Sequence, residues 1–357
     1  MRPQEPAMQI GIDSFAAVVS DPATGVTLSA SQRLQHLIEE IETADRAGVD
    51  SFGVGEHHRQ EYLDSAPAVI LAAAASRTDR IRLTSAVTVL SAADPVRVFQ
   101  EFATLDLLSG GRAEIVAGRG SFTEAFPLFG LALQDYDSLF AEKLDLLLKL
   151  RESTQVHWTG QHRAPLTGQG VYPRPVQSPL PVWLGVGGTP QSFVRAGLLG
   201  LPLMVAIIGG DLRQFRPLID LYREAGRRAG HAPESLKVGV HAFGFVAPTT
   251  TQALDAFYPG YARMLETVGR ERGWAPPRRA QFDAAAGPGG PYLIGDPQTV
   301  AEKALWVNDV LGGIDRLTFQ MTNVLLPHAG MLEAIDLLGG RVKPLVQHAL
   351  AQGVPTT

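Results

Sequence analysis

The chain has 357 residues, of which 45% are hydrophobic and 19% charged, and its formal net charge is −5. This composition is typical of a folded globular protein with a large core, and mild acidity without basic clusters argues against nucleic acid or an anionic membrane as a partner. The absence of cysteine excludes disulfides, thiol nucleophiles, iron–sulfur clusters and cysteine-ligated zinc, and it is compatible with a reducing compartment.

The chain start and the apolar runs predict neither a targeting signal nor a membrane span. The N-terminal stretch MRPQEPAMQIGID lacks the long apolar segment of a signal peptide. The most apolar runs, such as LPLMVAIIGG, are far too short to cross a bilayer. We therefore expect a cytoplasmic protein with a disordered tail at residues 1–7 and a single domain at residues 8–351.

Predicted strands and helices alternate along the chain. Apolar, β-branched runs predict strands at 8–13, 51–55, 81–90, 113–118, 181–188, 201–207, 237–247 and 315–321. Helical spacing of apolar residues predicts helices at 31–48, 94–111, 137–153, 190–200, 211–230 and 331–350. In the first helix, Leu34, Leu37, Ile38 and Ile41 fall on one face, as in an amphipathic helix.

The alternation predicts the fold class. Gly48, Gly110 and Gly230 follow three of the predicted helices, where a left-handed residue commonly ends a helix. Strands that are apolar on both faces and alternate with helices indicate a parallel sheet, and eight such strands are the number that closes a barrel. We predict a (β/α)8 TIM barrel rather than an open doubly wound sheet.

Two segments rich in proline and glycine interrupt this alternation. Residues 156–180 lie before the fifth strand, and residues 272–297 lie between the seventh and eighth strands. Long connections of this kind are commonly lids or binding loops. Composition leaves two interpretations open, a lid over the barrel mouth and a disordered insertion.

Titratable side chains follow the second strand, at Glu56, His57 and His58. On an extended chain the two histidines point to opposite faces, so they do not bind one metal ion together, and no metal site is predicted. General acid–base chemistry is the functional interpretation, because imidazole titrates near neutral pH. The alternative is one solvent-facing and one structural histidine. We expect Glu56 to anchor backbone or an arginine, and Phe15 to line the pocket or pack in the core.

The turn GVGGTPQS after the fifth strand is typical of an anion site. Its glycines allow backbone to approach a ligand, Thr189 can cap the next helix, and the N–H groups of Gln191 and Ser192 are predicted to be free at its positive end. Arg119, after the fourth strand, would add a positive charge. The turn therefore predicts a phosphate clamp, with an ordinary helix-capping turn as the alternative. A dinucleotide G-x-G-x-x-G fingerprint is not met, because position 190 is proline.

Several motifs together resemble one family. They are GVGEHHRQEY, IRLTSAVTVLSAADPVRVFQEFATLDLLSGGRAEIVAGRGSF, PVWLGVGGTPQS, YLIGDPQTVAEKAL and LPHAGMLEAIDLLG. In order and spacing they are similar to those of the bacterial luciferase-like flavin-dependent monooxygenases, from about Met8 to about Leu345. The resemblance implies a (β/α)8 barrel that binds reduced FMN supplied by a separate reductase. It also implies oxygenation of a small organic substrate by O2 through a C4a-peroxyflavin.

The resemblance also implies residue roles. It places the catalytic histidine at His57, with His58 beside it near the reactive edge of the flavin. It implies a non-proline cis peptide at Ser85–Ala86, beneath the flavin ring. The implied cofactor-binding residues are Ser85, Ala86, Arg119, Gly187, Gly188, Thr189 and Ser192. The implied partners are a small-molecule substrate, a transiently bound flavin reductase and a second copy in a homodimer.

Two positions depart from the luciferase pattern and keep other functions open. Asp137 stands where luciferase has a second arginine, and Gly188 stands where it has a carboxylate. The main alternative is an F420-dependent oxidoreductase of the same superfamily, which transfers hydride without oxygen chemistry. The others are a catalytically silent luciferase-like subunit and, from a different class, a metal-dependent barrel hydrolase.

Overall fold

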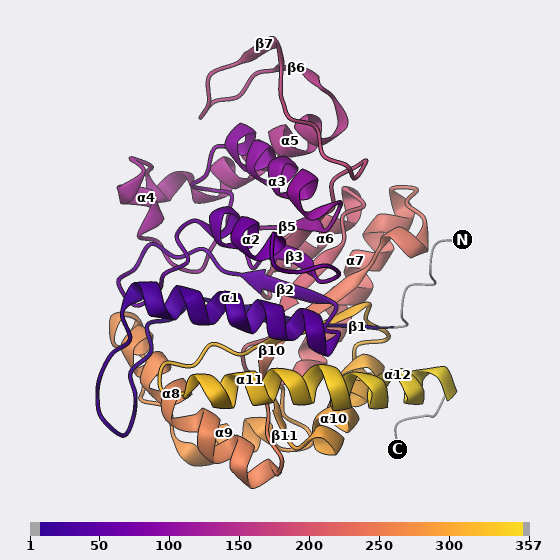
Figure 1. The fold of residues 1–357 in the computed structure, drawn as a ribbon. Coiled ribbons are helices and arrows are strands. Elements are labelled where there is room, and N and C mark those ends of the chain that lie inside the picture. The colour runs from indigo at the N-terminus through magenta and orange to yellow at the C-terminus, as the bar shows by residue number, and fades with distance from the viewer. Residues whose placement is uncertain (1–7, 353–357) are drawn as a thin grey trace.

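The computed structural model describes residues 8–352 and contains a closed parallel barrel (Figure 1). Its strands, in chain order, are β1 (Gln9–Ser14), β2 (Ser51–Val54), β3 (Arg82–Ser85), β5 (Ala113–Gly118), β8 (Val182–Val186), β9 (Leu203–Ala206), β10 (Val238–Val246) and β12 (Arg316–Gln320). Each pairs in parallel with its neighbour, and β9 pairs with β10 while β12 pairs with β1, which closes the ring. The predicted TIM barrel is confirmed. The predicted tail at residues 1–7 lies outside the described residues.

The helices form the outer layer of the barrel (Figure 1). They are α1 (Ala30–Ala47), α2 (Pro67–Ala75), α3 (Pro95–Ser109), α5 (Tyr136–Glu152), α6 (Pro190–Leu198), α7 (Arg216–Arg228), α8 (Thr250–Arg272), α10 (Pro297–Val310), α11 (His328–Leu337) and α12 (Lys343–Gln352). The segment predicted as one helix at 331–350 is α11 and α12, joined by a π-helical turn at Leu338–Val342. The segment at 211–230 begins with a 3₁₀ turn, Leu212–Phe215.

Local sequence explains the helix ends. Ser29 caps α1 in a reciprocal capping box with Gln32, and Gly48 ends that helix at φ 82°. Gly110 and Gly230 also have left-handed backbone, at φ 67° and 87°, as predicted. Of the ten outer helices named above, three were not predicted. Helix α2 is uniformly apolar and so lacks periodicity, α8 contains Pro259, and α10 lies in a motif that indicated family rather than structure.

Both predicted insertions are present, and both carry regular structure. The first contains an antiparallel hairpin of β6 (Gln155–Trp158) and β7 (Leu166–Gly170), which projects at the top of Figure 1 beyond α5. The second contains α9 (Arg279–Ala286) and β11 (Leu293–Gly295), and β11 extends the sheet by pairing with β10. The long strand predicted at 81–90 is also divided, into β3 and the short β4 (Thr88–Val89).

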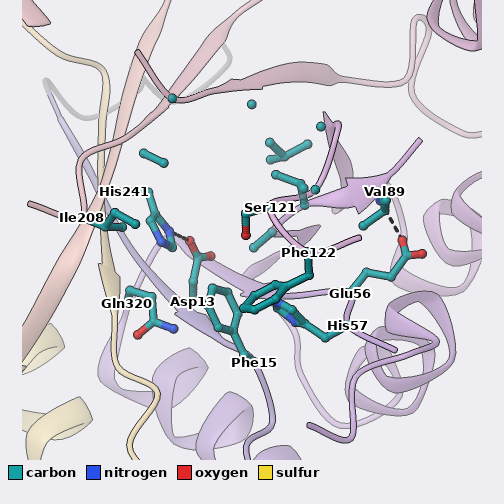
Figure 2. A pocket seen from close by; sticks show the side chains of 18 of the residues that line it. Asp13, Phe15, Glu56, His57, Val89, Ser121, Phe122, Ile208, His241 and Gln320 are labelled. Atoms are coloured by element: carbon teal, nitrogen blue, oxygen red, sulfur yellow. Dashed lines mark hydrogen bonds and ion pairs between the residues drawn. The ribbon is translucent and has the colours of Figure 1, made fainter. Parts of the chain in front are cut away.

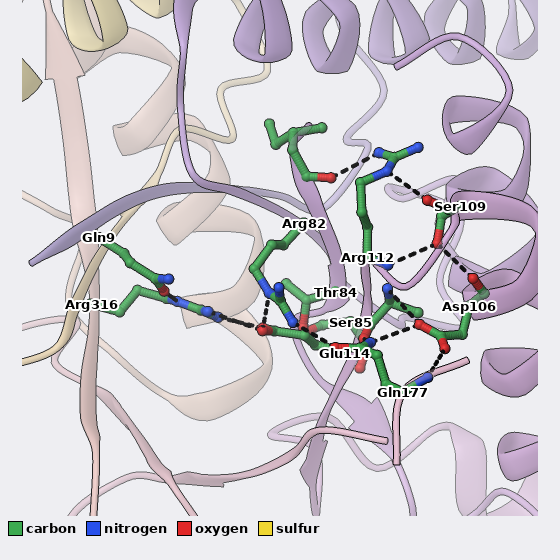
Figure 3. A network of polar contacts seen from close by, with 12 residues as sticks. Gln9, Arg82, Thr84, Ser85, Asp106, Ser109, Arg112, Glu114, Gln177 and Arg316 are labelled. Atoms are coloured by element: carbon green, nitrogen blue, oxygen red, sulfur yellow. Dashed lines mark hydrogen bonds and ion pairs between the residues drawn. The ribbon is translucent and has the colours of Figure 1, made fainter. Parts of the chain in front are cut away.

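The barrel has a cavity at the carboxyl ends of its strands (Figure 2) and a buried ionic network near their amino ends (Figure 3), and Arg316 of this network also lines the cavity. Glu114 on β5 accepts hydrogen bonds from both terminal nitrogens of Arg316, at 2.7 and 3.2 Å, and also pairs with Arg82. The guanidinium of Arg316 stacks on Trp183, with 4.5 Å from its central carbon to the ring centroid. Burial alone would raise the pKa of Glu114, but the two arginines lower it to about 2. The network therefore joins β3, β5 and β12 across the barrel interior.

We expect Glu114→Gln to lower the free energy of unfolding by about 3–5 kcal/mol, because it leaves a buried guanidinium without its counter-charge. Since the folded pKa lies below the ordinary value of 4.5, the stabilisation by ionised Glu114 is present above 4.5 and is lost as pH falls towards 2. Urea unfolding across this pH range measures both effects. Glu333→Gln, at an exposed position of α11, is the control; equal losses in the two variants would contradict the prediction.

Candidate active site

A cavity of about 590 Å³ opens at the carboxyl ends of the barrel strands (Figure 2). This volume is within the range of pockets that hold cofactors and small ligands. The cavity brings together seven of the predicted site residues, namely His57, His58, Ser85, Ala86, Arg119, Gly187 and Gly188. Thr189 and Ser192 do not line it. Phe15, which was predicted to line the pocket or pack in the core, is among its walls.

His57 is held by a buried carboxylate that the sequence analysis missed. Its Nδ1 lies 2.9 Å from Oδ2 of Asp64, and its backbone N–H donates to Oδ1 of the same side chain at 3.1 Å. Asp64 is fully buried, and burial raises its pKa. Because the carboxylate accepts the Nδ1 proton, the neutral imidazole presents the lone pair of Nε2. Seven residues separate the two side chains, in a loop without a recognised motif.

Glycine makes room for this pair. A Cβ atom on Gly55 would lie 2.6 Å from Oδ2 of Asp64 and 2.7 Å from the ring of Phe15, closer than real Cβ contacts. Aromatic rings enclose the imidazole, with centroids of Phe15, Tyr62 and Phe122 at 4.6, 4.6 and 5.2 Å from that of His57. The imidazole of His57 is therefore held in one orientation in a largely apolar pocket.

His58 and Glu56 form a second pair beside it. Nε2 of His58 lies 3.2 Å from Oε1 of Glu56, and this hydrogen bond raises the pKa of His58. The other oxygen of Glu56 accepts the backbone N–H of Val89 at 2.8 Å (Figure 2). The expectation that Glu56 anchors backbone is confirmed, since this bond ties the β2 loop to β4.

The cis peptide lies between Ala86 and Val87, one residue later than predicted at Ser85–Ala86. Ser85 remains in β3 because its Oγ exchanges hydrogen bonds with the backbone of Val116 on β5, so the chain departs from the strand only afterwards. The side chain of Val87 then enters space left by two glycines: a Cβ on Gly118 or Gly185 would lie 2.6 or 2.9 Å from it. Ala86 and Val87 thus form one wall of the cavity.

Arg119 and the glycine turn lie at the same cavity, and Thr189 is at the predicted N-cap position, but the expected free N–H of Ser192 is wrong. Thr189 is the N-cap residue of α6, yet its side chain makes no capping hydrogen bond. The N–H of Ser192 is not free, because it donates to the carbonyl of Thr189 at 2.9 Å and closes the first turn. Gly187 and Gly188 do face open space, since a Cβ on either would meet no atom within 4 Å.

A carboxylate of the protein, Asp137, competes with any anionic ligand for Arg119. Its guanidinium lies 2.5 Å from Oδ1 of Asp137, at the start of α5, and above the ring of Tyr136 at 5.1 Å. The Asp137 side chain is 77% exposed, so the pair is solvated and an incoming phosphate can replace the carboxylate at modest cost. The position that departs from the luciferase pattern therefore contacts the predicted phosphate-binding arginine directly.

The two insertions contribute unequally to the cavity. No residue of 156–180 lines it, because the hairpin packs against α5, so the lid interpretation of that segment is wrong. From 272–297, Arg272 and Trp274 reach the mouth. Arg272 stacks on Phe122 and Trp274 at 4.9 and 5.1 Å and donates to the carbonyl of Ser121.

The sequence analysis also missed a polar pair on the cavity floor. Asp13 on β1 and His241 on β10 are joined by a hydrogen bond of 2.6 Å between Oδ2 and Nδ1. Each lies in an apolar strand and had no neighbouring motif to mark it. Only closure of the barrel brings β1 and β10 to either side of β12.

A family model described as luciferase-like monooxygenase matches residues 8–310. The chain belongs to the luciferase-like monooxygenase family. One curated relative is 4-hydroxyprotoasukamycin monooxygenase of Streptomyces nodosus subsp. asukaensis, 30% identical over 240 residues, or 63% of this chain and 62% of that protein. The chain spans just under two thirds of the length of four curated relatives that it matches, 62–65%.

Solved structures share the luciferase-like fold at lower identity. Monooxygenase RslO1 from Streptomyces bottropensis has a TM-score of 0.81 at 23% identity, covering 94% of this chain and 99% of that one. The oxygenating constituent of 3,6-diketocamphane monooxygenase from Pseudomonas putida, in complex with FMN, has a TM-score of 0.75 at 19% identity, covering 95% of this chain and 98% of that one. An F420-dependent secondary alcohol dehydrogenase has a TM-score of 0.74 at 19% identity, covering 96% of this chain and 99% of that one. The fold thus occurs with both cofactor types.

Within residues 8–352, no helix combines the length and apolar character needed to span a bilayer. In the same range, no cluster of three or more histidine, aspartate or glutamate side chains is arranged to hold a metal ion.

We expect Asp64→Asn to change the tautomer of His57. The carboxylate only accepts, which fixes the proton on Nδ1, whereas an amide can also donate to that nitrogen. NMR of protein with ¹⁵N-labelled histidine should show neutral His57 as the Nδ1–H form in the wild type and a larger Nε2–H population in the variant. His162, a half-buried histidine hydrogen-bonded to Ser138, is the internal control. An unchanged tautomer ratio at His57 would remove Asp64 from the orienting role.

Proposed function

We propose that this member of the luciferase-like family is a monooxygenase that uses reduced FMN and O2 to oxygenate a small, largely apolar organic substrate. The supporting observation is the convergence, in one cavity, of an oriented histidine, a positively charged side chain and an open glycine turn. When bound, reduced FMN would supply the two electrons that activate O2, of which one oxygen atom enters the substrate and the other leaves as water. The family membership supports this chemistry, although the relatives include users of F420.

The residues present fit a flavin mononucleotide. Gly187 and Gly188 leave open space beside Arg119 where a phosphate group can approach the backbone. Ala86 and Val87 offer a flat apolar wall to a planar ring. His57 directs Nδ1 to Asp64, so its Nε2 points away from that carboxylate and would hold or move a proton at the edge of the flavin ring. His58 would assist as a second imidazole of raised pKa.

Exclusion of water is the second requirement for oxygen transfer. The mouth is bordered by the apolar residues Met264, Leu265, Val268 and Trp274. The ion pair of Arg59 with Glu271 joins the β2 loop to the end of α8, with the closest contact at 2.5 Å. Arg59 and Arg272 lie over the ring of Phe122, at 5.1 and 4.9 Å. This border would shield the reacting centre.

An anaerobic titration tests the proposal. We expect reduced FMN to bind, and subsequent mixing with O2 to give a transient absorbance band that belongs neither to reduced nor to oxidised flavin. Binding of reduced F420 with hydride transfer and no oxygen dependence would instead establish the alternative cofactor. Tight flavin binding without any reaction would indicate a silent subunit.

We expect Arg119→Ala to weaken the affinity for reduced FMN by about 10- to 100-fold, the range for loss of a charged hydrogen bond. Asp137→Asn should strengthen it by about two- to fivefold, because an exposed competing carboxylate is removed. Anaerobic fluorescence titration measures both constants. Arg341→Ala, at an exposed position, is the matched control. Equal affinity of all variants would place the phosphate elsewhere.

We expect His57→Ala to retain affinity for reduced FMN within about twofold and to lower substrate turnover by about 10²- to 10⁴-fold, the usual contribution of a general acid–base group. Oxygenated product and uncoupled hydrogen peroxide are measured under the same conditions. Normal product yield would show that His57 is structural.

The partners remain part of the proposal. A separate flavin reductase would supply the reduced cofactor. We also propose a cytoplasmic homodimer formed through α2 and α3, which carry exposed apolar side chains. Val69, Leu107 and Leu108 are 70%, 46% and 63% exposed. Such side chains on adjacent helices are suited to a contact with a second copy.

A further inference from the structure

A second carboxylate–histidine pair lies on the cavity floor, apart from His57 and its partner. His241, 9% exposed, directs Nδ1 to Asp13, 4% exposed, at 2.6 Å, and both residues line the cavity (Figure 2). Within residues 8–352, Nε2 of His241 makes no hydrogen bond. An imidazole that donates from Nδ1 to a carboxylate presents an acceptor at Nε2 while it is neutral.

The barrel is built to hold this pair. A Cβ on Gly53 would lie 1.9 Å from Oδ1 of Asp13, so the neighbouring strand leaves space for the carboxylate. Phe15 stacks on the imidazole, with ring centroids 6.2 Å apart and planes inclined by 17°. The ring centroid of Phe15 also lies 4.6 Å from that of His57. Phe15 therefore contacts two imidazoles, each of which directs Nδ1 to a carboxylate.

The surroundings define what the acceptor can bind. Around His241 the cavity is lined mainly by apolar side chains, including Phe15, Ile208 and Phe243. The polar neighbours on β12 are Thr318, which pairs with His241 in register, and Gln320, which is occupied by two hydrogen bonds with Thr322. A ligand that packs here and satisfies Nε2 must be apolar and carry a hydrogen-bond donor. A buried acceptor left without a donor would weaken binding of an analogue that lacks one.

We propose that His241, oriented by Asp13, is a substrate-binding residue that accepts a hydrogen bond from a hydroxyl group, and that the substrates are aromatic or alicyclic compounds bearing such a hydroxyl. This inference rests on the proposed oxygenase function, because the bound compound is a substrate only if the protein is an oxygenase. It assigns the two histidines different tasks, with His57 at the cofactor and His241 at the hydroxyl. Asp13 is a positioning residue.

Calorimetric titration with 2-naphthol and its methyl ether, 2-methoxynaphthalene, tests the proposal at neutral pH without flavin. We expect the wild type to bind 2-naphthol more tightly than the ether. In His241→Ala, the ratio of the dissociation constant of the ether to that of 2-naphthol should fall by about tenfold. Asp13→Asn should reduce the selectivity, since an amide no longer fixes the tautomer. His157→Ala, at an exposed position of β6, is the control. Selectivity unchanged in His241→Ala would overturn the proposal.

A second measurement does not depend on folding of the His241 variant. In ¹⁵N-histidine-labelled His57→Ala protein, which keeps the Asp13–His241 pair, 2-naphthol should shift an Nε2 resonance and 2-methoxynaphthalene should not. Equal shifts, or none, would contradict the proposal. Adding reduced FMN anaerobically should preserve the selectivity; its loss would show that His241 faces the cofactor. Because the naphthol titrations need no flavin, their failure is distinguishable from failure of the reduced-FMN titration.

Discussion

Closure of the parallel barrel is the constraint on which the site depends. The pairings of β9 with β10 and of β12 with β1 turn eight separate strand ends into one rim. Residues as distant in sequence as Asp13 and His241 then touch. Towards the amino ends of the strands, Glu114 and its arginines join β3, β5 and β12, and Arg316 of this network reaches the lining of the cavity. The ionic contacts that hold the strands together therefore lie directly beneath the cavity at the carboxyl ends.

Buried carboxylates orient the histidines of this rim. Asp64 and Asp13 each accept from an Nδ1 atom, which leaves two Nε2 atoms for ligands in a cavity that is otherwise mainly apolar. Arg119 is different, because its partner Asp137 is solvated and replaceable. The cavity therefore combines rigid proton-handling groups with an adjustable charge. This combination suits a protein that binds a cofactor reversibly and must hold a substrate beside it.

Sequence reasoning recovered the elements with clear periodicity and the residues in recognisable turns. The eight barrel strands, the helix-ending glycines and the location of His57, His58 and Arg119 at strand ends followed from pattern and spacing. Sequence patterns did not reveal Asp13, Asp64 and His241, because the pairs that these residues form exist only in the folded structure. The prediction of a free Ser192 N–H failed because of one hydrogen bond, to the carbonyl of Thr189. The predicted cis bond was misplaced by one residue, next to Ser85, whose two hydrogen bonds with Val116 no sequence pattern encodes.

The stretch FGVGEHH contains two glycines, Gly53 and Gly55, and the absence of a side chain at each leaves room for the carboxylate that orients one histidine of the cavity. Gly53 leaves room for the carboxylate behind His241, and Gly55 for the carboxylate behind His57. β2 and the residue directly after it thus leave room for the two carboxylates, Asp13 and Asp64, that orient these imidazoles. Anyone recruiting this scaffold for new substrates would leave β2 intact and vary the aromatic walls, Phe15 excepted, since its ring braces both imidazoles.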